Sequence, residues 1–138
     1  MQRPARILVL VAMGVIATLM AVFSADIDPP KPSDPLAQFP TSIDLIIRNQ
    51  KLATLTNTEA LMSLIRKGWR VPAHRCTARG RLVLHLGNEN TAEMSILPGH
   101  TRTNYEIICT RGYLAVPRSA FLSVLASAGV ETNRIPLK

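Results

Sequence analysis

Aromatic side chains are scarce in this chain. Phenylalanine, tyrosine and tryptophan together make up 4% of its 138 residues. A surface that stacks nucleic-acid bases needs several aromatic rings beside a basic groove. We therefore do not expect nucleic acid as a partner.

The sequence also lacks the short motifs that are typical of common enzyme families. It has no G-x-S-x-G turn, no H-E-x-x-H pair, no phosphate loop and no S-x-x-K motif. We interpret His85 as a half-exposed strand residue, and His74 and His100 as surface-loop residues. The acids Glu93 and Glu106 are scattered over predicted strands. We expect no enzymatic activity and no cofactor.

Cysteine is limited to Cys76 and Cys109. A C-x-x-C pair is absent, and the spacing His74-x-Cys76 is not typical of metal ligands, so we expect no metal site. In an oxidising compartment a lone cysteine pair usually forms a disulfide. Closing a loop of about 34 residues would stabilise the domain by ~3.5–4 kcal/mol. The sequence predicts this disulfide, with two buried free thiols as the alternative.

A long apolar run does occur, near the N-terminus. Residues 7–25 carry no charge and follow Arg3 and Arg6. A helix of that length reaches ~28 Å, close to the ~30 Å hydrocarbon core of a bilayer. Gly14 and Thr18, four residues apart, would let another membrane helix approach closely. The run predicts a single-pass signal anchor.

The charge flanking this run predicts its orientation. Basic residues stay on the cytoplasmic side, so residues 1–6 would be cytoplasmic. The rest of the chain would lie in the periplasm of a Gram-negative bacterium, anchored in the inner membrane. The alternative is a signal peptide cleaved after Ser24, the best cleavage site in this stretch.

The remaining chain divides into a spacer and one domain. Residues 26–41 hold five prolines and predict a semi-rigid linker, and residues 42–138 suffice for one small core. Residues 42–55 fit either a strand or a helix. After them we expect, in order, a helix, two β-hairpins and a final helix that begins at Pro117 and ends at Gly129. The expected fold class is α+β: a transmembrane helix followed by a small antiparallel sheet of two hairpins flanked by helices.

Basic residues outnumber acidic ones, which gives a net charge of +7. The positive charge is concentrated in a segment without acids, which we call the basic run. It contains Arg66, Lys67, Arg70, Arg75, Arg79 and Arg81, with Trp69 among them. Such a surface attracts phosphates, lipid headgroups or an acidic protein, although a merely solvated face is an equal alternative.

Two hypotheses of function follow. The first is a non-catalytic accessory subunit of an inner-membrane complex (photosynthetic, respiratory or secretory), whose partners are other membrane subunits and the bilayer. The second is a periplasmic binding or sensor module that recognises an anionic ligand or lipid headgroup through the basic run. The location of Trp69 would help to discriminate them.

Overall fold

The computed structural model describes residues 34–135, which form a seven-stranded antiparallel sheet and two helices. The sheet has the order β2-β1-β4-β5-β6-β7-β3. The strands are β1 (Ser42–Ile47), β2 (Gln50–Leu55), β3 (Trp69–Val71), β4 (Gly80–His85), β5 (Thr91–Pro98), β6 (Asn104–Cys109) and β7 (Gly112–Pro117). The helices are α2 (Glu59–Arg66) and α3 (Arg118–Ser127), and short 3-10 turns occur at η1 (Pro35–Ala37) and η2 (Thr132–Arg134).

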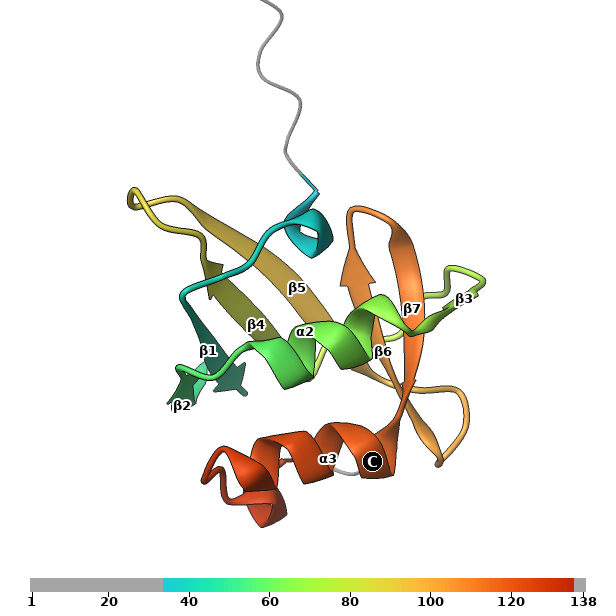
Figure 1. Cartoon of the computed structure of the whole chain (residues 1–138). Helices are drawn as coiled ribbons and strands as arrows, with labels where there is room; N and C mark the ends of the chain where they lie inside the picture. The colour runs from blue at the N-terminus through green and yellow to red at the C-terminus, as the bar shows by residue number, and fades with distance from the viewer. Residues whose placement is uncertain (1–33, 136–138) are drawn as a thin grey trace, which may run out of the picture. The chain divides into compact units, whose positions relative to one another are not determined.

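Both helices cover the same face of the sheet (Figure 1), which we call the inner face. Alternate strand residues point to this face because successive side chains of a strand point to opposite sides. Leu45, Leu82 and Met94 lie at paired positions across β1, β4 and β5 and are fully buried. Leu61 of α2 and Phe121 of α3 complete this core.

The two helices begin and end differently. The N-cap of α2 is Thr58, whose hydroxyl donates to the Pro40 carbonyl (2.8 Å) rather than to an amide of the helix. Helix α3 ends as predicted. Gly129 has φ of 82°, and the Val130 amide donates to the Leu125 carbonyl (3.0 Å), as in a Schellman motif.

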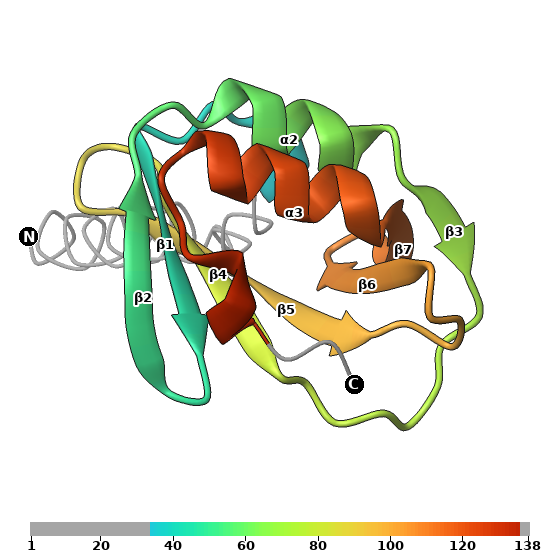
Figure 2. The same ribbon diagram turned by 90° about the horizontal axis from the view of Figure 1, so that it is seen from below.

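The connection from β3 to β4 covers part of the other face of the sheet, which we call the outer face. Strand β3 lies at one edge, next to β7, whereas β4 lies beyond β5, β6 and β7. The chain must therefore cross three strands, and residues 72–79 do so on the side away from the helices (Figure 2). We call residues 72–79 the crossing segment. It buries an outer-face row of paired residues, Leu97, Glu106 and Ala115.

The structure corrects the expected fold class. The predicted hairpins occur as β4–β5 and β6–β7, but the sheet also contains β1, β2 and β3, so a small sheet of two hairpins is wrong. The ambiguous residues 42–55 form a third hairpin. Within residues 34–135 neither helix is long and apolar enough to cross a bilayer. The span expected at residues 7–25, with Gly14 and Thr18, lies outside the described residues. What residues 34–135 show, in place of a transmembrane helix, is a sheet-rich domain.

Candidate functional site

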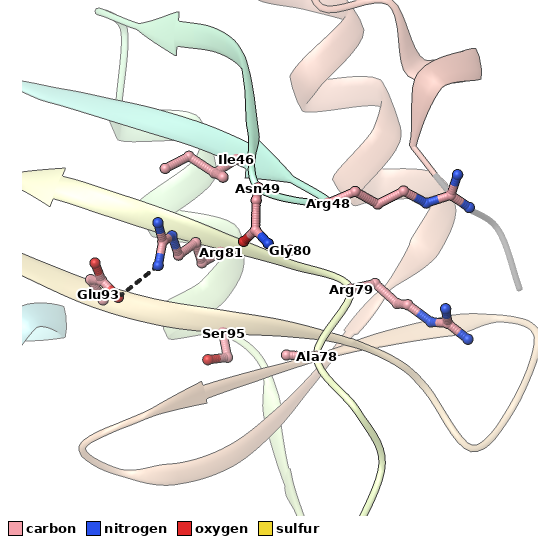
Figure 3. A pocket seen from close by; sticks show the side chains of 9 residues that line it. All are labelled: Ile46, Arg48, Asn49, Ala78, Arg79, Gly80, Arg81, Glu93 and Ser95. Carbon is pink, nitrogen blue, oxygen red and sulfur yellow. Dashed lines mark ion pairs between the residues drawn. The ribbon is translucent and has the colours of Figure 1, made fainter.

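A hollow of about 370 Å³ opens on the outer face where β1 ends and β4 begins. We call it the arginine hollow (Figure 3). Its charged residues are Arg48, Arg79, Arg81 and Glu93. The remaining lining residues are Ile46, Asn49, Ala78, Gly80 and Ser95.

The backbone holds two of these arginines side by side. Arg48 and Asn49 form the two-residue turn between β1 and β2, and the Arg48 amide donates to the Arg79 carbonyl (3.2 Å). Both turn residues have positive φ, 50° for Arg48 and 63° for Asn49. Asparagine tolerates this conformation, but for an arginine it costs about 1–2 kcal/mol. Positive φ at both positions is what a two-residue hairpin turn requires, and Asn88 and Glu89 share it in another turn of the sheet.

The charges of the hollow are only partly compensated. Arg81 pairs with Glu93 at 3.9 Å, a contact drawn in Figure 3. Arg48 and Arg79 are exposed, and within residues 34–135 neither has a carboxylate partner. Their side chains extend to the same side in Figure 3, away from Arg81. Two like charges on adjacent segments repel each other, and an anion between them would relieve that repulsion.

The basic run does not form one surface. Arg66 donates from its guanidinium to the carbonyls of Leu36 (2.7 Å) and Gln38 (2.8 Å), and it lies over the Phe39 ring. The Arg66 side chain therefore fastens the first residues of the domain to α2. Lys67 and Arg75 are exposed at other places, after α2 and in the crossing segment.

Strand β3 places the next two members of the run on opposite faces. Arg70 pairs with Leu114, whose side chain belongs to the core, so it points to the inner face. Trp69 pairs with Ala115 on the outer face and is 47% exposed, so it is neither a core residue nor part of the arginine hollow. Only Arg79 and Arg81 of the predicted set reach the hollow.

Sequence reasoning missed Arg48. The signal was present: Arg48-Asn49 separates two alternating apolar segments, and a two-residue connection with asparagine is typical of a hairpin. The same segment also fitted a helix, and in a helix Arg48 would not lie in a turn, so the signal was not decisive.

A second group of polar side chains lies under the crossing segment. His74, His100 and Glu106 offer ligand atoms that all lie within 4.8 Å of one another. His74 Nε2 contacts Glu106 Oε2, and His100 contacts Glu106 Oε1 through both its backbone amide and Nδ1 (3.2 Å each). The Tyr113 hydroxyl donates to the His74 carbonyl (3.2 Å) and fixes the segment above the sheet. We call this group the His–Glu cluster.

Burial and hydrogen bonding act in opposite directions on Glu106. The residue is only 3% exposed, which by itself raises its pKa, but hydrogen bonds from His74 and His100 outweigh burial and lower it. His100 is exposed as predicted, whereas His74 is half-buried rather than a free surface residue. Because 32 residues separate His74 from Glu106, no local pattern could reveal this contact.

The predicted disulfide between Cys76 and Cys109 is not formed, and both cysteines are free. Cys109 packs against the core on the inner face, and its sulfur contacts the Gly112 carbonyl (3.7 Å). Cys76 is exposed in the crossing segment, on the outer face. The sheet therefore separates the two sulfurs.

A third histidine contact makes the stability of the domain sensitive to acid. Burial raises the pKa of Asp44, but hydrogen bonds from Lys51 (2.7 Å), Thr54 (2.7 Å) and His85 (3.1 Å) outweigh it and lower the pKa from 3.8 to about 2. A lowered pKa stabilises the fold above pH 4, and this contribution is lost as the pH falls from about 4 to 2.

We expect Asp44→Asn to be less stable than the unchanged chain by roughly 1–2 kcal/mol at pH 7, after discounting for the exposed partners. At pH 2, where about half of the folded molecules have Asp44 protonated, the difference should shrink to a few tenths of a kcal/mol. Urea unfolding at both pH values measures the difference. A gap of the same size at pH 2 would contradict this assignment.

No protein-family model, curated protein or solved structure matches this chain.

Proposed function

We propose that this domain is a non-catalytic binding module for a phosphate-bearing ligand, which it holds at the arginine hollow. The observation that carries the proposal is the pair Arg48 and Arg79, two guanidinium groups on adjacent backbone segments without a carboxylate partner in the described part of the chain. Guanidinium groups bind phosphate through paired, charge-assisted hydrogen bonds.

The other lining residues suit the same ligand. Asn49 and Ser95 offer neutral hydrogen-bond donors in the lining of the hollow. Among residues 34–135, Glu93 is the only acid that lines the hollow, and it pairs with Arg81. The volume of about 370 Å³ accommodates a phosphate or pyrophosphate group with its water, rather than a large apolar molecule.

The accessory-subunit hypothesis depends on residues 7–25, which lie outside the described residues. It stays a prediction, and no feature of residues 34–135 adds support to it.

The test is calorimetric titration of the full chain with inorganic pyrophosphate at 0.1 M salt. Arg48→Gly removes the guanidinium and suits the positive φ of the turn, so the unfolding temperature should stay the same or rise. Arg48→Gly and Arg79→Gln should each weaken binding at least tenfold, because a charged hydrogen bond contributes about 1.5–3 kcal/mol.

Lys67→Gln is the matched control, since it removes one positive charge outside the hollow. Its binding should equal that of the unchanged chain. An equal loss in all three variants would mean nonspecific attraction and would overturn the proposal. Vesicles containing phosphatidylglycerol, compared with neutral vesicles, tell a lipid headgroup from a free phosphate.

A further inference from the structure

We propose that His74, His100 and Glu106 bind one divalent metal ion of the zinc class. Three ligand atoms within 4.8 Å of one another approach the separations found around a single ion, whose bonds to nitrogen and oxygen measure about 2.0–2.2 Å. A small movement of the side chains suffices to close the site.

The donor set selects the class of ion. Two imidazole nitrogens and one carboxylate oxygen suit zinc and related transition metals, whereas calcium and magnesium prefer oxygen ligands alone. Three protein ligands also leave one position for water. His100 is 62% exposed on its side chain, so the ion and its water can reach the cluster from solvent.

The placement of Glu106 argues for more than a surface contact. Its carboxylate lies between Leu97 and Ala115, which are both fully buried. Burying a carboxylate between apolar residues is costly unless strong partners compensate it, and here His74 and His100 do so through hydrogen bonds. A divalent cation bonded directly to the carboxylate is the strongest such partner.

The ligands come from three separate parts of the chain. His74 belongs to the crossing segment, His100 to the turn after β5, and Glu106 to β6. An ion bound here would fasten the crossing segment to the sheet. That segment has no regular secondary structure, so strand-to-strand hydrogen bonds do not hold it in place. The bound ion would hold it through its metal–ligand bonds instead.

Binding through His74 Nε2 has a distinct signature. The Cys76 amide donates to His74 Nδ1 (3.3 Å), and Nε2 faces Glu106, so these partners assign the proton of a neutral ring to Nε2. A metal on Nε2 requires the proton on Nδ1 instead. A ring that carries its proton on Nε2 must therefore release it to solvent and take one up on Nδ1, which breaks the contact with the Cys76 amide.

The experiment uses the untagged full chain, stripped with EDTA and titrated with zinc chloride in a calorimeter. We expect one equivalent to bind, and the unfolding temperature to rise by roughly 10 °C at a hundredfold excess over the Kd. Nitrogen-15 spectra should show the His74 proton moving from Nε2 to Nδ1.

Three variants locate the site. His100→Ala changes an exposed side chain and should weaken zinc binding at least tenfold, whereas His85→Ala removes the one histidine of the sequence outside the cluster and should leave zinc binding unchanged. Cys76→Ser tests the neighbouring thiol as a rival ligand and should also bind normally. The proposal is overturned if no zinc binds, if Cys76→Ser weakens binding and His100→Ala does not, or if His74 keeps its proton on Nε2.

Discussion

Phe121→Ala should lower the free energy of unfolding by about 3–5 kcal/mol. The side chain is fully buried on α3, and its ring lies against the Tyr105 ring of β6, with 5.4 Å between centroids and an angle of 62°. Truncation loses this aromatic contact and leaves a cavity between helix and sheet. Urea unfolding followed by circular dichroism measures the loss.

Phe39→Ala deletes the same atoms at the surface and serves as the matched control. Phe39 is 78% exposed, and its described ring contact is the guanidinium of Arg66. We expect a loss below about 1 kcal/mol, because an exposed cation–π contact contributes little more. Similar losses in both variants would contradict the assignment of Phe121 to the core.

Gly99→Ala should cost about 3 kcal/mol, although it adds a single methyl group. A Cβ at Gly99 would lie 2.3 Å from the Asn104 carbonyl oxygen and 2.9 Å from its carbonyl carbon. Both are backbone atoms of the turn that carries His100, so no side chain can rotate away to make room. The turn must open, which should also move His100 from Glu106.

Gly112→Ala provides the comparison for this prediction. Gly112 has φ of 98°, but a Cβ added there would meet no atom within 4 Å, so alanine costs only its unfavourable backbone conformation, about 1–2 kcal/mol. Thermal unfolding of the two variants measures the ranking, and the imidazole resonances of His100 should shift only in Gly99→Ala. A larger loss at Gly112 would contradict the packing argument.

The two candidate sites depend on the same piece of chain. The crossing segment carries His74 of the His–Glu cluster and, at its end, Ala78 and Arg79 of the arginine hollow. The Arg79 amide donates to the Ile96 carbonyl (2.8 Å), which ties this end to β5. Both sites lie on the outer face, whereas the helices fill the inner face.

Local periodicity predicted the parts whose contacts are local. The alternation of Leu82, Leu84 and Leu86 indicated β4, and Gly129 with Val130 indicated the end of α3. Residues 42–55 were ambiguous because isoleucines at positions 43, 46 and 47 also fit one helical face. Pairing of β1 with β4 settles that ambiguity, and the partner strand lies about 40 residues further along the chain.

The sequence alone determined the composition of this domain: its excess of arginine, its two cysteines, two of its hairpins and the ends of its last helix. Tertiary structure decided which of those residues meet. The order of strands forces residues 72–79 across the outer face, which brings His74 to Glu106 and Arg79 to Arg48, and separates Cys76 from Cys109. These outcomes depend on strand order, and strand order depends on contacts between segments far apart in the chain.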